Sequence, residues 1–94
     1  MPKTLHLNQN YPNPFNPTTV ISYRLPMSSN VKLNIFNILG QRIKTLVNSF
    51  QSAGEHSLVW DATDYKSNPV SSGMYFYSLD TGDQSLQKKM ILVR

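Results

Sequence analysis

The fold class of this chain follows from residues 30–48, which read NVKLNIFNILGQRIKTLVN. Apolar and polar residues alternate on both sides of a central Asn37-Ile38-Leu39-Gly40, and a period of two is typical of a half-buried strand. Asn in the first position and Gly in the fourth favour a type I turn that ends in a residue with positive φ. We therefore predict antiparallel strands at residues 30–36 and 41–48, with Asn37 and Gly40 as the structural residues of the turn.

This turn also predicts the register of the hairpin. If Asn37 pairs with Gln41, the inward residues of the two strands face one another: Ile35 opposite Ile43, Leu33 opposite Thr45 and Val31 opposite Val47. A shift by one residue would set apolar side chains against polar ones throughout.

Short runs of the same kind recur along the rest of the chain, separated by clusters of Asn, Pro, Gly and Ser. No segment keeps a helical period over a useful length. We expect five more strands, at residues 3–7, 19–25, 55–61, 73–80 and 85–93. Seven short strands with turn signals at this spacing predict an all-β sandwich or barrel. Its core should include Trp60, Tyr75 and Tyr77.

The segment 10–17 reads Asn-Tyr-Pro-Asn-Pro-Phe-Asn-Pro. Its three prolines fix φ and remove backbone donors, so we predict a stiff, mostly extended loop with Tyr11 and Phe15 covering one end of the core. We divide the single domain into a lead-in (1–18) and a sandwich (19–94). Two roles stay open for the loop residues, a rigid spacer or a docking loop for a partner: Tyr11, Pro12, Asn13, Pro14 and Phe15.

Composition excludes several classes of protein. The 94 residues are 39% hydrophobic and 15% charged, which suits one folded domain, and the absence of cysteine excludes disulfides and thiolate metal sites. No apolar run is long enough to span a membrane. The first five residues lack the apolar run of a signal peptide, so an exported protein would carry that signal elsewhere in a longer precursor. The net charge is +4, but the basic residues are scattered, and we expect no nucleic-acid binding.

No pattern in the sequence predicts catalysis or a bound cofactor. His6 and His56 are isolated, and His56 shares its phase with Leu58 and Trp60, which places it at the rim of the core. Asp61 and Asp64 offer at most a weak Ca²⁺ site, because acids in turns ordinarily cap their own backbone. We therefore expect no enzyme, no metal site and no cofactor.

The two last predicted strands are apolar on both faces. Met74 and Phe76 alternate with inward tyrosines, and we place Met90 opposite Tyr75 and Leu92 opposite Gly73. Either a loop covers the second face, or the face is kept for a partner, or the edge takes part in strand addition. The candidate recognition residues are Lys88, Lys89, Met90, Ile91, Leu92, Val93 and Arg94.

Five motifs together resemble the C-terminal sorting domains of the type IX secretion system (type A) of Bacteroidetes and related phyla. They occupy residues 10–19 with 21–23, residues 36–41, residues 53–56 with 60–61, residues 72–77 and residues 88–94. Each motif is short, but their order and spacing over residues 5–94 are specific. Asn37 stands where family members often carry Asp, and both residues suit the turn.

The resemblance implies an Ig-like antiparallel β-sandwich of about seven strands that acts as a non-catalytic export signal. It implies an N-terminal passenger, an outer-membrane translocon and a sortase-like protease as partners, and the surface or medium of a Gram-negative cell as the destination. The same sandwich also resembles the Ig-like domain of the flagellar hook-capping scaffold, a structural alternative. A carbohydrate-binding accessory module is a third possibility, with Phe76 as its only evident outward aromatic residue.

Overall fold

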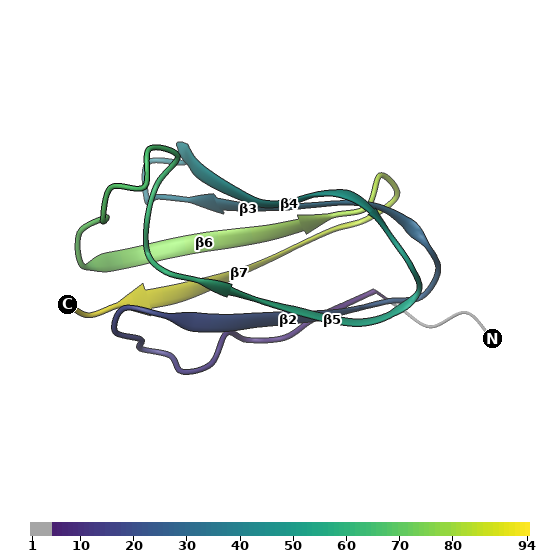
Figure 1. Ribbon diagram of the computed structural model, residues 1–94, viewed down its shortest axis with the longest axis horizontal. Coiled ribbons are helices and arrows are strands. Elements are labelled where there is room, and N and C mark those ends of the chain that lie inside the picture. The colour runs from purple at the N-terminus through teal and green to yellow at the C-terminus, as the bar shows by residue number, and fades with distance from the viewer. Residues whose placement is uncertain (1–4) are drawn as a thin grey trace.

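The computed structural model describes residues 5–94, which form two antiparallel sheets and contain no helix (Figure 1). The three-stranded sheet has the order β1-β2-β5, and the four-stranded sheet has the order β4-β3-β6-β7. The seven strands of this part of the chain are β1 (His6–Leu7), β2 (Thr19–Leu25), β3 (Ser29–Phe36), β4 (Arg42–Gln51), β5 (Gly54–Trp60), β6 (Gly73–Asp80) and β7 (Ser85–Leu92).

The all-β sandwich predicted from the sequence is confirmed. Most strand ends agree with the prediction within one or two residues, whereas β4 continues three residues further, to Gln51. The start of the first predicted strand, and most of the segment judged to lack a signal peptide, lie outside the described residues.

The turn between β3 and β4 has the predicted geometry. The amide of Gly40 donates to the carbonyl of Asn37 (3.0 Å), and the amide of Asn37 donates to the carbonyl of Gln41 (3.0 Å). Gly40 has a φ of +82°, which a residue without a Cβ adopts at no steric cost. The Asn37 side chain adds to the turn, because its Oδ1 accepts from the amides of Leu39 and Gln41.

The predicted register of this hairpin is wrong. The observed partners are Ile35 with Lys44, Leu33 with Val47 and Val31 with Ser49. The ten residues of β4 lie opposite eight residues of β3, so two residues of β4, Ile43 and Leu46, have no partner and form bulges.

The bulges have a physical reason in the composition of β4. Its apolar residues Ile43, Leu46 and Val47 do not alternate strictly, and the extra residues let all three pack against the core. Thr45 then lies opposite Asn34 on the outer face, where its hydroxyl donates to Asn34 Oδ1 (2.8 Å). Packing of all three apolar side chains against the core therefore stabilises the hairpin more than a regular ladder of backbone hydrogen bonds would.

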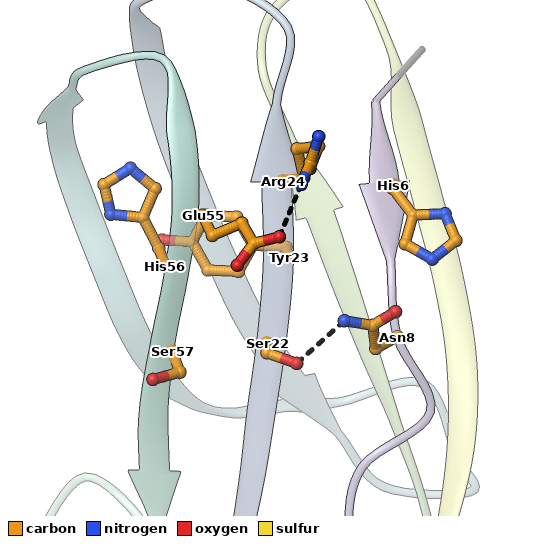
Figure 2. Close-up of a pocket in the computed structure, with 8 residues that line it drawn as sticks. All are labelled: His6, Asn8, Ser22, Tyr23, Arg24, Glu55, His56 and Ser57. Carbon is orange, nitrogen blue, oxygen red and sulfur yellow. Dashed lines mark hydrogen bonds and ion pairs between the residues drawn. The ribbon is translucent and has the colours of Figure 1, made fainter. Parts of the chain in front are cut away.

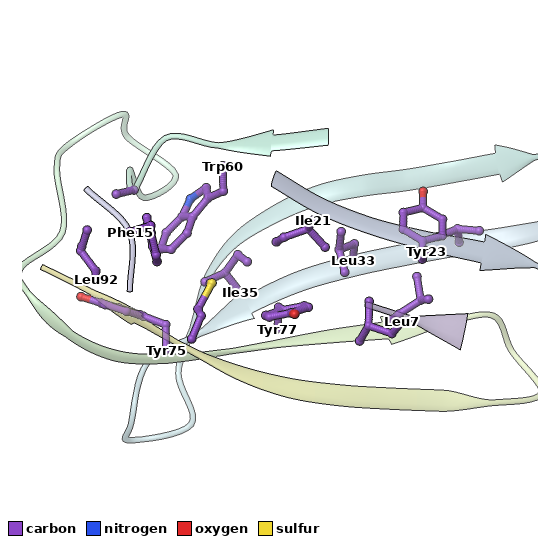
Figure 3. Close-up of a cluster of buried hydrophobic side chains, with 14 of the residues drawn as sticks. Leu7, Phe15, Ile21, Tyr23, Leu33, Ile35, Trp60, Tyr75, Tyr77 and Leu92 are labelled. Carbon is purple, nitrogen blue, oxygen red and sulfur yellow. The ribbon is translucent and has the colours of Figure 1, made fainter. Parts of the chain in front are cut away.

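The core fills the space between the two sheets (Figure 3). Trp60 is 1% exposed and packs against the rings of Phe15 and Tyr75, with centroids 5.8 and 5.6 Å away. Its indole Nε1 donates to the carbonyl of Thr63 (3.0 Å). Trp60, Tyr75 and Tyr77 thus lie in the core, as the alternation of their strands predicted.

The lead-in packs as part of the same core, because Leu5, Leu7 and Phe15 are all buried in it. Phe15 covers one end of the core as expected, but the same prediction for Tyr11 is wrong, since its side chain is 79% exposed. The segment is also not mostly extended: it bends at residues 12–14 and 16–17. Phe15, which lies between the two bends, turns inward, and its backbone pairs with Leu92 at the end of β7.

We expect Trp60→Ala to lower the free energy of unfolding by about 3–5 kcal/mol, because it removes a buried ring that two other rings pack against. Chemical denaturation of the purified chain measures this change. Val59→Ala is the matched control: Val59 is 60% exposed on the other face of β5, and its truncation should cost about 0.5 kcal/mol or less. Equal stability of the two variants would contradict the central place of Trp60.

Burial raises the pKa of Tyr77 to about 12, although a hydrogen bond from the Asn10 amide opposes the shift. The unfolded chain therefore loses this proton near pH 10 while the folded chain still holds it, so stability falls with pH between about 10 and 12. Burial also raises the pKa of Tyr23. We expect Tyr77→Phe to flatten this fall without abolishing it. Denaturation between pH 8 and 12 measures the slopes, and parallel curves for both chains would contradict the assignment.

Candidate functional site

The C-terminal strand presents two different faces. Met90 lies opposite Tyr75 and Leu92 opposite Gly73, and both side chains are buried, as predicted. Between and after them, Ile91 is 41% exposed and Val93 is 50% exposed. Half of the apolar side chains at this end of the chain therefore serve the core, and the other half face outward.

The two lysines before this apolar run also face opposite ways. Lys88 lies opposite Tyr77 on the inner face and is partly buried, and Lys89 lies opposite Phe76 and is exposed. Because β7 is an edge strand, a charge on its inner face disfavours pairing with another chain.

The free edge of β7 is covered near its end by the proline-rich segment. The amide of Ile91 donates to Asn13 Oδ1 (3.0 Å), and the amide of Phe15 donates to the carbonyl of Ile91 (3.0 Å). The amide of Val93 donates to the carbonyl of Phe15 (2.9 Å). We call residues 9–15 the strap. The strap bonds the carbonyl of Lys89, both backbone groups of Ile91 and the amide of Val93, along the edge where the sequence analysis allowed a partner to add a strand.

The strap is held at its base by polar contacts that the sequence analysis missed. Asn10 is 2% exposed, and its Nδ2 donates to Thr19 Oγ1 (2.9 Å) and to the carbonyl of Pro12 (3.1 Å). The backbone amide of Asn10 donates to the hydroxyl of Tyr77 (2.8 Å). Gln9 donates to the carbonyl of Lys89 (2.7 Å). The sequence carried no signal for these contacts, because Asn10 is one of four asparagines in residues 8–16 and only the structure shows that it is buried and therefore needs partners.

The C-terminus lies at the same end of the sandwich as the loop between β5 and β6 (Figure 1), and Arg94 binds this loop. Its Nε donates to the carbonyl of Val70 (2.6 Å), and its Nη2 donates to the carbonyl of Ala62 (3.0 Å). Its amide donates to Ser72 Oγ (2.9 Å). Of the predicted recognition residues, Met90, Leu92 and Arg94 therefore have structural contacts within the chain, while Lys89, Ile91 and Val93 have exposed side chains.

A polar pocket of 570 Å³ lies on the three-stranded sheet (Figure 2). An ion pair joins Arg24 and Glu55 (2.5 Å), and the hydrogen bond from Arg24 lowers the pKa of the Glu55 carboxyl, with its positive charge as a second cause. His6 and His56 come from strands on opposite sides of β2. His56 stacks on Tyr23 (5.4 Å) and bonds the carbonyl of Ser52 (2.8 Å). Among residues 5–94, no hydroxyl is hydrogen-bonded to a histidine that could act as its base.

The acidic residues of the loop after β5 bond their own neighbours. Asp64 Oδ1 accepts from the amides of Lys66 (2.9 Å) and Asn68 (3.0 Å), and Asp61 Oδ1 accepts from the hydroxyl of Thr63 (2.5 Å). No group of three or more His, Asp or Glu side chains that could hold a metal ion occurs within residues 5–94. The described part of the chain also has no helix that could span a membrane.

The expectation that Phe76 is the only evident outward aromatic residue is wrong. Phe76 is partly buried, whereas Tyr11, Phe50 and Tyr65 are 79%, 66% and 56% exposed. These three lie on the strap, at the end of β4 and in the loop after β5. They come from three separate elements and give no single row of the kind that a sugar-binding sheet face presents.

Comparisons with known proteins agree with this architecture. Over 99% of its length the chain is similar to latent dimeric PorU of Porphyromonas gingivalis (19% identity, TM-score 0.73), of which it covers 10%. It is similar over 92% of its length to PorZ, an essential surface component of the type IX secretion system of that organism (18%, 0.65), of which it covers 11%. The chain thus spans about a tenth of either protein.

A third similar structure is FlgD of Xanthomonas campestris, a protein of flagellar hook capping. Here 96% of the chain matches 62% of FlgD, at 21% identity and a TM-score of 0.63. Because the sequence identities to these three structures are all below 25%, the similarity shows a shared fold and nothing about function. A comparison with curated protein sequences found no significant match.

The family comparison is more specific than the structural ones. The model of the secretion system C-terminal sorting domain matches residues 9–93, which is nearly the whole chain. The match includes the strap, the β3–β4 turn and the C-terminal strand. The chain therefore belongs to the secretion system C-terminal sorting domain family, as the type IX sorting motifs in its sequence indicated.

Proposed function

We propose that this domain is a non-catalytic address that directs an N-terminal passenger through the type IX translocon. Its partners are the outer-membrane translocon and a sortase-like protease, and the passenger reaches the surface or the medium of a Gram-negative cell. Membership of the sorting-domain family supports this function.

The observation that carries the proposal is the outer face of the C-terminal strand. Ile91 and Val93 remain half exposed although the strap bonds the backbone beside them. The core does not need these side chains, since Met90 and Leu92 already fill it from the same strand. Exposed apolar side chains on a rigid strand suit recognition by a partner. We propose that the address is read from side chains on this face.

The strap has a different role in this proposal. Its Phe15 ring and its bonds to β7 hold the C-terminal strand in place, so that the exposed side chains keep a fixed geometry. This positioning of β7 is a third role for residues 11–15, beside the rigid spacer and the docking loop that the sequence left open. A hook-capping role is supported only by the shared fold, and the family match favours sorting.

Fusion of residues 1–94 to a periplasmic reporter tests the function. In a type IX-competent host we expect the reporter at the cell surface or in the medium, and in a strain without the secretion apparatus we expect it in the periplasm. Fractionation followed by a reporter assay measures the distribution. A reporter that stays in the periplasm of both strains would contradict the sorting function.

Replacement of Ile91 and Val93 together by Thr tests where the address is read. Thr keeps the strand propensity and the backbone bonds, so we expect melting within a few degrees of wild type and a loss of export. The matched control replaces Val20 and Val59 by Thr, since these residues pair on the exposed face of the other sheet. Normal export of the first variant would exclude recognition through these side chains, and parallel loss of stability and export would leave only a packing role.

A further inference from the structure

A row of four residues crosses the outer face of the four-stranded sheet. The strand register places Arg42 opposite Phe36, Phe36 opposite Phe76 and Phe76 opposite Lys89. Residues in register share a face. The adjacent residues Ile35, Tyr75, Tyr77 and Met90 are buried in the core, so Phe36, Phe76 and Lys89 lie on the opposite, outer face. The row therefore consists of two partly buried phenyl rings between two cations on opposite edge strands.

The apolar part of the row continues toward the end of the sandwich. In the next row, Met74 lies opposite Ile91, and both are exposed by about two fifths. Beyond Phe36, the turn residues Ile38 and Leu39 are 68% and 78% exposed. We call Phe36, Phe76, Met74, Ile91 and Ile38 the platform. The platform and its two cations thus draw on β3, β4, β6 and β7.

Grooves on both sides of Phe76 would receive side chains of a partner. One groove of 310 Å³ is bordered by Phe36, Ile38 and Phe76. The other, of 380 Å³, is bordered by Phe76 and the two lysines of β7. A partly buried aromatic ring beside such grooves is the arrangement at which protein interfaces concentrate their binding energy.

The two charged residues of the row are both positive. Asp64 lines one groove with Ile38 and Met74 and another with Arg42, and its Oδ1 accepts from the backbone amides of Lys66 and Asn68. Arg42 and Lys89 stand about 14 Å apart, the width of three strand spacings. The guanidinium of Arg42 lies 5.9 Å from the ring centre of Tyr65, a cation–π contact that positions it. Of the five acidic residues in the sequence, none belongs to this row, and the only one on the strands of this sheet, Asp80, lies opposite Lys32.

Resting on the sorting function proposed above, we propose that this platform docks an acidic protein surface, with apolar side chains on the two rings and carboxylates beside Arg42 and Lys89. Charge complementarity selects this occupant. A second copy of the chain would bring the same cations face to face in a two-fold pair, at a cost in repulsion. A membrane would bind through protruding apolar side chains, which the turn residues Ile38 and Leu39 are, whereas the two rings of the row, Phe36 and Phe76, are partly buried in the sheet. A membrane would therefore not use the two rings.

The test uses the reporter fusion in the type IX-competent host. We expect Phe76→Thr, and separately Arg42→Gln with Lys89→Gln, to lower export by about tenfold, the equivalent of roughly 1.4 kcal/mol of binding. The matched control replaces Arg24 and Lys32 by Gln, which also removes two positive charges from exposed strand faces but lies outside the row. The control should export within about twofold of the wild type. Melting curves must show that all three chains remain folded.

Each other outcome overturns the proposal. Normal export of both row variants shows that the platform is not used. The sorting function itself fails only if the wild-type fusion stays in the periplasm, so the two failures can be told apart. Loss of export for Phe76→Thr alone excludes an acidic partner. Sedimentation of the purified chain with phosphatidylglycerol vesicles, abolished by Phe76→Thr, would favour a membrane. A concentration-dependent dimer abolished by the same change would favour a second copy.

Discussion

The pairing of Phe15 with the end of β7 is the interaction on which the rest of this structure depends. The Phe15 backbone bonds Ile91 and Val93, and its ring packs on Trp60 between the sheets. One residue of the strap thus closes the edge of the four-stranded sheet and fills the end of the core. Without it, the last strand would expose its amides and carbonyls, a liability that edge strands ordinarily avoid.

Closure of this edge changes how the C-terminal strand can be recognised. Because the Lys89 carbonyl, both backbone groups of Ile91 and the Val93 amide are bonded to the strap, we propose that a partner contacts mainly side chains on the outer face. These include Ile91 and Val93, and the register continues the same face through Met74 and Phe76 to Phe36. The candidate site is therefore a surface of the whole sheet, even though its sequence signal is strongest in the last seven residues.

Prediction from the sequence was most successful where local chemistry decides the structure. The turn at Asn37–Gly40 follows from two residue types, and the alternation in the C-terminal strand correctly placed Met90 and Leu92 inward. The prediction of the register between β3 and β4 was wrong. The register depends on whether Ile43 and Leu46 gain more stability by packing against the core than by joining a regular ladder of backbone hydrogen bonds. Tyr11 and Phe15 were equivalent in the sequence, and only their positions relative to β7 and Trp60 separate them.

The sequence by itself determined a cysteine-free β-sandwich, the positions of its strands and its central turn, because these depend on the period of apolar residues and on backbone preferences. Its family was indicated separately, by the order and spacing of five motifs. Only the tertiary structure decided which side chains meet. It joined the strap to β7, Arg94 to the carbonyls of Ala62 and Val70, and Arg42 to the same row as Lys89. These contacts join residues far apart along the chain, and their partners are fixed by sheet order and by two bulges that strand periodicity does not encode.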